Sequence, residues 1–285
     1  MFKIITSLLF SFSFINAQIA LPTFQAVHKP HNITSSTSST VGPVITGRWA
    51  QVGAILANGT VKFWGRNDFG QLGQGNTNNI GDGSGEMGDN LPAIDLGTGR
   101  TATAISLGYL LSVVLLDNGT VKAWGYNAYG QLGQGNKNRI GDGSGEMGDN
   151  LPAIDLGTGR TATAIAAGNY HVVALLDNGT VKAWGYNSSG QLGQGNTNHI
   201  GDGSGEMGDN LPAIDLGTDR TATAISGGYY LSIVRLDDGT IKAWGDGRYG
   251  QLGRGNTNYI GDGSGEMGDN LSPIDLSSSS DATLE

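Results

Sequence analysis

The chain has 285 residues, a length that allows one or two domains, and its formal net charge is −9 at pH 7. This acidic excess argues against a nucleic-acid partner, because binding to a phosphate backbone requires a basic patch. The absence of cysteine excludes disulfides and thiolate chemistry. The 49 glycines recur at fixed offsets, which is typical of turns in a regular repeat fold.

The first 17 residues have the order of a secretory signal peptide. Lys3 gives a short basic start, residues 4–15 are mostly apolar, and Ala17 ends a tripeptide that suits cleavage. We therefore expect a mature chain that begins at Gln18 and is secreted or extracytoplasmic. Residues 1–17 are too short to span a bilayer as a helix, and no other apolar run is long enough, so no transmembrane segment is expected.

Residues 18–42 differ in composition from the rest of the chain, with two prolines and a run of Ser and Thr. Such a segment buries too little apolar surface to offset the entropy of ordering, so we expect a flexible leader. The sequon at residues 32–34 makes Asn32 a glycosylation candidate. Residues 277–285 are expected to form a disordered tail.

Residues 43–276 contain four copies of one 60-residue repeat, each marked by a Trp-Gly pair. In the second copy, alternating or β-branched apolar segments at 101–105, 109–116 and 120–124 predict three strands. Asp-Asn-Gly lies between the last two and predicts a hairpin, because Asn and Gly tolerate positive φ. A long Gly-rich loop leads to residues 151–156, which are predicted as a fourth strand at the edge of the sheet because Pro152 lacks an amide donor.

This pattern predicts an all-β fold: a propeller-type array of four four-stranded blades, without helical periodicity. A blade cannot bury both of its faces alone, so neighbouring blades must stack. The recurring Trp64, Trp124, Trp184 and Trp244 are therefore expected to pack between blades rather than to stack on a ligand.

The repeat resembles that of the regulator-of-chromosome-condensation family. The third copy carries the matching residues, which are Gly168 with His171, Asp177-Asn178-Gly179, Trp184-Gly185-Tyr186-Asn187, Gly190-Gln191-Leu192-Gly193 and Pro212. The other copies match from the hairpin turn onward. The resemblance covers roughly residues 43–276 and implies a β-propeller. It does not imply the nucleotide exchange of the founding member, which relies on non-repeating loops and a basic surface that are absent here.

Closure of the propeller is an open point, because relatives commonly have seven blades and four is the low limit for propellers. An arc of four blades would leave the apolar flanks of its first and last blades wet, at roughly 25 cal/mol per Å². We expect either a ring that closes within one chain or an end-to-end dimer. We favour a closed or nearly closed form of the single chain, because it requires no partner concentration.

The loop before the fourth predicted strand repeats the same acidic residues in every copy. Its oxygens are of the kind that calcium prefers, but Asp and Asn also bond their own backbone in tight turns. Turn formation is the simpler interpretation, calcium binding is the alternative, and no other cofactor is expected. The Gly-x-Gly-x-x-Gly in this loop lacks the strand and helix of a dinucleotide site. The candidate calcium ligands are Asp82, Glu86, Asp89, Asp142, Glu146, Asp149, Asp202, Glu206, Asp209, Asp262, Glu266 and Asp269.

In a meander, the loop between the first two strands and the loop after the third strand lie on one face of the array. The positions that vary between copies fall on this loop face, and exposed aromatic residues on a rigid scaffold favour a binding surface. Capping of the blade ends is the alternative. All twelve acidic loop residues are expected there too, where they would need counter-ions or a basic partner. The candidate binding residues are Trp49, Phe69, Tyr109, Tyr129, Tyr170, His171, Tyr229, Tyr230 and Tyr249.

These features favour a secreted scaffold that binds a protein or another ligand through the loop face, without catalysis. Near-identical repeats place one residue type at four related positions, whereas catalysis requires different residues in converging roles. Two alternatives stay open: a calcium-binding structural or surface array, and a propeller hydrolase or lyase with a site in the central channel. A protein partner is expected, and the sequence does not identify it.

Overall fold

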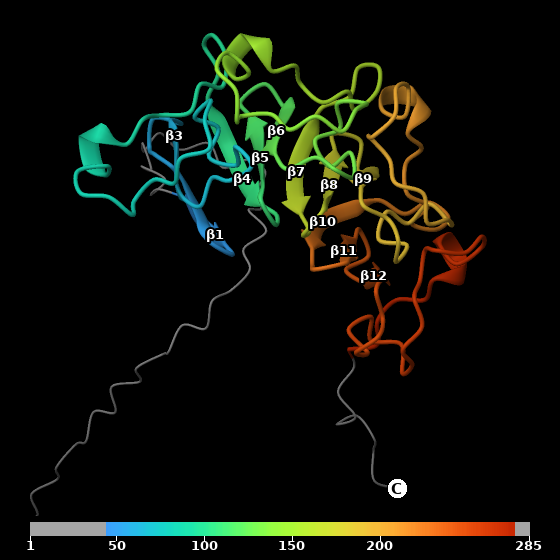
Figure 1. Ribbon diagram of the computed structural model, residues 1–285. Helices are drawn as coiled ribbons and strands as arrows, with labels where there is room; N and C mark the ends of the chain where they lie inside the picture. Colours follow the sequence, from blue (N-terminus) through green and yellow to red (C-terminus); the bar gives the residue numbers. More distant parts are fainter. Residues whose placement is uncertain (1–43, 277–285) are drawn as a thin grey trace, which may run out of the picture.

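The computed structural model describes residues 44–276 as four antiparallel sheets of three consecutive strands each (Figure 1). We call each sheet with its following loop a blade: blade 1 is residues 44–96, blade 2 is 102–156, blade 3 is 162–216 and blade 4 is 222–276. The expected signal peptide, leader and tail, with Asn32, lie outside the described residues. The strands are β1 (Val44–Arg48), β2 (Gln51–Ile55), β3 (Val61–Gly65), β4 (Ala102–Leu107), β5 (Leu111–Leu116), β6 (Val121–Gly125), β7 (Ala162–Ala167), β8 (His171–Leu176), β9 (Val181–Gly185), β10 (Ala222–Gly227), β11 (Leu231–Leu236) and β12 (Ile241–Gly245). The short 3₁₀ helices are η1 (Gly88–Asn90), η2 (Gly148–Asn150), η3 (Gly208–Asn210) and η4 (Gly268–Asn270).

The hairpins form where the sequence predicts them. In blade 2 the Leu116 amide donates to the Thr120 carbonyl at 2.9 Å, which closes the β5–β6 turn. Gly119 in this turn has φ of 80°, a conformation that glycine adopts without strain. The first strand of the same sheet carries a bulge between Ala102 and Ala104. The predicted all-β, propeller-type fold is thus confirmed.

The fourth strand predicted for each blade does not form. In blade 2, residues 151–156 share one backbone hydrogen bond with β6, from the Ile154 amide to the Val121 carbonyl at 2.8 Å. Pro152 has no amide donor, and the carbonyl of the last residue in the segment accepts a hydrogen bond from Lys182 of blade 3 at 2.9 Å. Each blade therefore consists of three strands and an extended outer segment. One isolated bridge, Gly125–Ile140 in blade 2, ties the loop between them to the end of the third strand.

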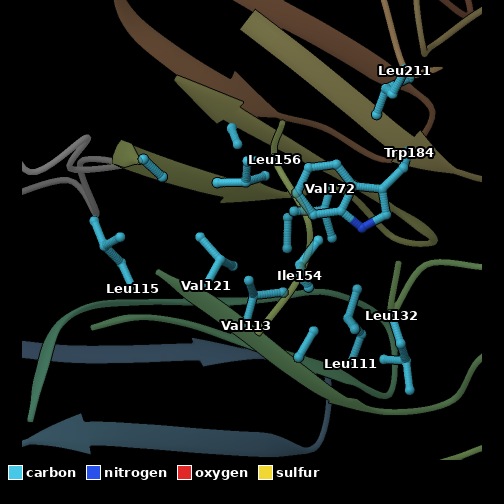
Figure 2. Close-up of a cluster of buried hydrophobic side chains, with 14 of the residues drawn as sticks. Leu111, Val113, Leu115, Val121, Leu132, Ile154, Leu156, Val172, Trp184 and Leu211 are labelled. Atoms are coloured by element: carbon cyan, nitrogen blue, oxygen red, sulfur yellow. The ribbon is translucent and has the colours of Figure 1, made fainter. Parts of the chain in front are cut away.

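The hydrophobic core lies between blades rather than within them. Figure 2 shows side chains from β5 and β6 of blade 2 facing Val172 and Trp184 of blade 3. The Trp184 side chain is fully buried, and its indole N–H donates to the Gln131 carbonyl of the preceding blade at 3.2 Å. Trp124 and Trp244 are buried in the same way, which confirms the prediction that these tryptophans pack between blades.

The four blades form an open arc, not a closed ring (Figure 1). Trp64 on blade 1 is half-buried, whereas its counterpart Trp184 is fully buried. Leu276 on blade 4 is 72% exposed, whereas its counterpart Leu156 is 4% exposed. The expectation of a ring closed within one chain is therefore wrong. Each junction rotates one blade relative to the next, and the rotations between four blades do not add up to a full turn.

Candidate binding face

The loops between the first two strands and the loops after the third strand meet on one face, as predicted. Rings from all four blades contact one another there, with centroids from 4.4 Å apart (Tyr229–Tyr230) to 6.3 Å apart (Tyr170–Tyr230). We call this group the aromatic patch. Its members are Trp49, Phe69, Tyr109, Tyr126, Tyr129, Tyr170, Tyr186, His199, Tyr229 and Tyr230.

Tyr170 lies at the centre of the aromatic patch. Partial burial raises the pKa of Tyr170 to about 12, and the neighbouring phenols add to this effect. Burial also raises the pKa of Tyr126 and of Tyr230. These three phenols therefore stay uncharged at physiological pH. The ring of Tyr170 contacts those of Tyr109, Tyr126, Tyr129, Tyr186 and Tyr230.

Trp49 stands at one end of the patch in a strained backbone conformation. Its φ is 55°, in the left-handed region that bulky residues rarely adopt. Such strain costs on the order of 1–3 kcal/mol and persists where the surrounding structure imposes it, often at binding sites. The side chain is 63% exposed and packs edge-on against Tyr109 at 4.8 Å. Trp49 thus combines a strained backbone with an exposed side chain.

A polar network supports the loops that carry the patch. Arg48 replaces the glycine found at this position in the other copies. Its guanidinium donates to the Ala167 carbonyl at 3.0 Å and to Asn169 Oδ1 at 2.8 Å, so it connects blade 1 directly to blade 3. Gln51 Nε2 donates to the Leu111 carbonyl of blade 2 at 3.0 Å. These bonds fix the spacing of the loops, which preorganises the rings above them.

Seven of the nine predicted binding residues lie in the aromatic patch, and two do not. Tyr249 is 86% exposed and lies outside the patch, with its ring 5.9 Å from the Arg248 guanidinium. The prediction that His171 lies on the surface is wrong. Its side chain is fully buried in β8, because the first residue of that strand points between blades.

Sequence reasoning missed Tyr126, Tyr186 and His199, which complete the patch. The signal was present in the sequence. Tyr126 and Tyr186 correspond to Arg66 in the first copy and Asp246 in the fourth, so this position varies between copies as the recognised ones do. The position of His199 varies in the same way.

A buried histidine–serine pair lies in the interior. His171 Nε2 is 3.1 Å from Ser232 Oγ, and that hydroxyl donates to the Gln191 carbonyl at 2.7 Å. The hydroxyl proton is thus already used, so the histidine N–H is the donor between the two side chains. Burial lowers the pKa of His171 to about 3, and the charge of Arg48 adds to this effect. A general base must accept the proton of its nucleophile, whereas His171 donates a proton to Ser232 here. The pair is therefore a packing contact and not a catalytic one.

The glutamates of the acidic loops bond to backbone amides. Glu86 Oε2 accepts hydrogen bonds from Gly81 at 2.7 Å and from Gly83 at 2.8 Å. These backbone bonds lower the pKa of Glu86. The other three copies repeat both bonds, which supports the interpretation that these carboxylates form turns.

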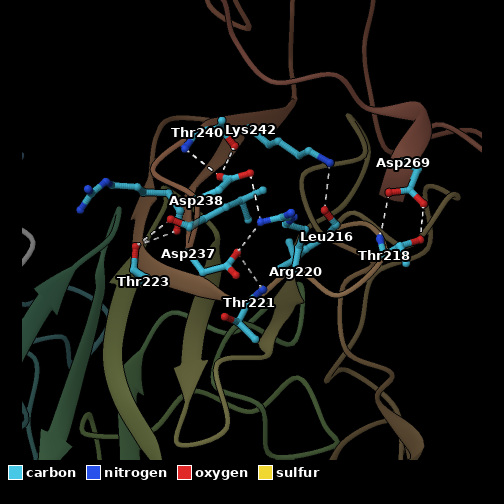
Figure 3. Close-up of polar contacts among 12 residues, drawn as sticks. Leu216, Thr218, Arg220, Thr221, Thr223, Asp237, Asp238, Thr240, Lys242 and Asp269 are labelled. Carbon is cyan, nitrogen blue, oxygen red and sulfur yellow. Dashed lines mark hydrogen bonds and ion pairs between the residues drawn. The ribbon is translucent and has the colours of Figure 1, made fainter.

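The last aspartate of the loop lies away from the aromatic patch. Asp269 accepts from the Thr218 amide at 2.8 Å and its hydroxyl at 2.5 Å, in the connection that leads into β10 near the β11–β12 turn (Figure 3). The prediction that all twelve carboxylates share the loop face is therefore wrong for this set. Within residues 44–276, no group of three or more His, Cys, Asp and Glu side chains could hold a metal ion.

The family resemblance predicted from the sequence is confirmed by comparison with known proteins. The family model described as Regulator of chromosome condensation (RCC1) repeat matches residues 102–131, 162–191 and 222–251, and a second model of that description matches residues 118–175. The chain is 34% identical over 153 residues to the human E3 ubiquitin-protein ligase HERC2, which covers 53% of this chain and 3% of that protein. It is 30% identical over 203 residues to the ultraviolet-B receptor UVR8 of Arabidopsis thaliana, covering 71% of this chain and 41% of the receptor. The chain thus spans less than half the length of these relatives.

Solved structures show the same fold. Human WBSCR16 superposes with a TM-score of 0.59 at 17% identity, covering 82% of this chain and 53% of that one. Yeast RCC1 (Prp20), solved with Kap60, gives a TM-score of 0.56 at 17% identity, covering 84% of this chain and 49% of that one. Both matches support the propeller architecture. Among the described helices of this chain, none has the length and apolar character needed to cross a membrane.

Proposed function

We propose that this chain is a secreted propeller-type scaffold that binds a protein partner through the aromatic patch. The observation that carries the proposal is the patch itself, because rings from four blades converge there at positions that vary between otherwise near-identical repeats. Tyr and Trp give large contact areas at a low entropic cost, and they are enriched at protein interfaces.

The surroundings of the patch resemble the rim of a protein interface. Arg66 and Asp68 form an ion pair at 2.6 Å, and the Arg139 guanidinium lies 4.8 Å above the ring of Phe69. A polar rim around an apolar centre is the usual organisation of such interfaces. A protein partner also agrees with the similar yeast RCC1 (Prp20), which was solved bound to Kap60.

Two substitutions on exposed members of the patch test this function. Trp49 and Tyr229 are 63% and 52% exposed, so Trp49→Ala and Tyr229→Ala leave the core intact. We expect the double variant to lose a partner that the unmodified chain captures from the extracellular material of its source. Arg160→Ala removes an exposed ion pair near the β8–β9 turn, which contributes little, and serves as the control that keeps the partner. Capture that is equal in all three proteins contradicts the proposal.

Secretion is tested separately by N-terminal sequencing of the protein recovered outside the cell. We expect the sequence to start at Gln18, because Lys3, the apolar stretch and Ala17 follow the order of a signal peptide. Recovery of a stable protein only inside the cell, still carrying Met1, contradicts secretion but leaves the binding proposal in place.

A further inference from the structure

Seven large hydrophobic side chains are exposed among the described residues, and all of them belong to blades 1 and 4. Two of them, Trp49 and Tyr229, are members of the aromatic patch. The others lie on what we call the open flanks, the sides of blades 1 and 4 that no neighbouring blade covers. They are Ile45, Leu56 and Met87 on blade 1, and Tyr249 and Leu276 on blade 4.

The counterparts of these side chains are covered at the junctions inside the chain. Leu56 is 37% exposed, whereas its counterpart Leu116 is 2% exposed and packs against blade 1. Leu276 is 72% exposed, whereas Leu156 is 4% exposed and packs against blade 3. Each open flank is therefore one half of a junction that the chain forms three times.

We propose that the open flank of blade 4 binds the open flank of blade 1 of a second copy of this chain, head to tail, in the geometry of the junctions inside the chain. This inference is independent of the proposed function of the aromatic patch. It commits to a second copy because that copy presents the same sequence and backbone that already fit this flank inside the chain.

The polar groups of the internal junctions have matching halves at the two ends. Lys182 Nζ donates to the carbonyl of Leu156 at 2.9 Å, across the junction, and to that of Gly208 at 2.8 Å, within its own blade. Lys62 on blade 1 donates to the Gly88 carbonyl of its own blade at 3.1 Å. In the proposed junction, Leu276 of the second copy supplies the carbonyl that corresponds to Leu156.

The indoles provide a second matched pair. Trp124 and Trp244 donate to the Gln71 and Gln191 carbonyls of their preceding blades, each at 3.1 Å. Trp64 has no preceding blade in the described part of the chain. Its acceptor in the proposed junction is the carbonyl of Gln251, which holds the position of Gln71 and Gln191 on blade 4.

The backbone of blade 4 also leaves room for a following blade. A Cβ atom built on Gly130 would lie 2.2 Å from the amide nitrogen of Asp202 in the next blade, and one built on Gly190 would lie 2.3 Å from that of Asp262. At Gly250, the matching position of blade 4, nothing lies within 4 Å. The internal junctions thus depend on a close backbone approach that blade 4 still offers.

The two open flanks carry opposite charges. On blade 4, the exposed Arg235 replaces the buried Leu115 and Leu175 of blades 2 and 3. On blade 1, Asp82 and Asp89 are exposed. At the internal junction between blades 2 and 3, Asp202, the counterpart of Asp82, pairs with Lys137 of the preceding blade at 2.9 Å, so a carboxylate at this position can face a base across a junction. The blade 4 counterpart of Lys137 is Thr257, so Arg235 supplies the positive charge from another position. Complementary charge of this kind favours pairing of unlike flanks over pairing of like ones.

Two chains joined in this way have two identical junctions and eight blades. Eight is within the range of known propellers, and a head-to-tail contact that closes makes a finite ring. The expected species in solution is therefore a dimer without free flanks.

Light scattering on the purified full chain and two flank variants tests the junction. Leu56→Glu places a charge on the blade 1 flank and Leu276→Glu places one on the blade 4 flank. Both positions are exposed in the single chain, so folding is preserved and is checked by circular dichroism. Ala153→Glu, at an exposed position on inner blade 2, is the matched control.

We expect a two-chain mass for the unmodified chain and the control, and a one-chain mass for each flank variant alone. An equimolar mixture of the two variants should recover a mixed pair, because one junction then joins two unmodified flanks. A monomeric unmodified chain overturns the proposal. So does a dimer that resists either variant, since pairing of like flanks would be sensitive to one variant only, and so does a mixture without the mixed pair.

Discussion

Trp184 and Trp64 occupy the same position of the same repeat, yet their environments differ. Trp184 is fully buried between blades 2 and 3 and donates to the Gln131 carbonyl. Trp64, at the end of the arc, is half-buried. The local sequence around the two is nearly identical, so the neighbouring blade and not the repeat itself supplies the burial. Each blade thus has two sides that pack against neighbouring blades. In an open arc, one such side stays uncovered on the first blade and one on the last.

The first prediction measures this difference directly. Trp184→Ala should lower the free energy of unfolding by about 3–5 kcal/mol, the cost of truncating a fully buried tryptophan. Trp64→Ala in dilute, monomeric protein should cost less than half as much, because fewer contacts are lost. Urea denaturation of both variants measures the two losses. Equal losses would mean that Trp64 is covered in the single chain.

The second prediction concerns the contact that joins an end blade to an inner one. Arg48→Gly installs the residue that the other three copies carry and removes the bonds to Ala167 and Asn169. Hydrogen bonds from a charged group are worth roughly 1.5–3 kcal/mol each at most, so we expect a loss of about 2 kcal/mol. Urea denaturation checks it. A variant as stable as the parent would show that this bridge does not hold blade 1 in place.

The third prediction uses the one inner blade that has His171 where two copies have leucine. Its pKa is lowered to about 3 by burial, while the unfolded value is near 6.5. Between these values the unfolded chain binds the proton and the folded chain does not, so stability falls as pH falls below about 6.5. The loss should reach about 2 kcal/mol from pH 7 to pH 5.

His171→Leu is the matched control for this pH dependence, because Leu111 and Leu231 are its counterparts. The variant should be less sensitive to pH over this range. Urea denaturation at both pH values gives the comparison. If the two proteins lose the same stability, other groups cause the dependence and the histidine is not held neutral.

Much of the blade could be predicted from the sequence, because its determinants are local. The Asp-Asn-Gly turn fixes the hairpin, and the Trp-Gly period fixes the number of blades. The missing fourth strand could not be predicted, because the carbonyl at the end of residues 151–156 accepts a hydrogen bond from Lys182 of the next blade instead of from a strand. No single repeat shows this contact. The open arc is also non-local: it depends on the rotation at each junction, which no single repeat shows.

The candidate site was predictable to the extent that it varies between copies. Trp49 and Tyr170 were recognised because the repeats differ at their positions. Tyr126 and Tyr186 were missed because each directly follows the recurring Trp-Gly pair and reads as part of that motif, although Arg66 and Asp246 show that the position varies. The prediction for His171 was wrong for the opposite reason, because its position varies between copies but its side chain faces the core. The alternation of side chains along a strand does not show which of them a neighbouring blade covers.

The last prediction has the smallest expected effect and concerns the acidic loops, which are the same in inner and end blades. Four calcium sites with dissociation constants of ~10⁻³ M would each add about 1.4 kcal/mol at roughly 10 mM calcium. That sum would raise the melting temperature by at least 10 °C or so in a protein of this size. We expect neither calcium nor a chelator to change it measurably, because Glu86 and its copies bond to backbone amides and Asp149, Asp209 and Asp269 bond to threonines. Differential scanning calorimetry with 10 mM calcium against a chelator decides this, and magnesium at the same concentration controls for ionic strength. A rise specific to calcium would show that these carboxylates rearrange around the ion, and it would restore the calcium-binding array as a function of this chain.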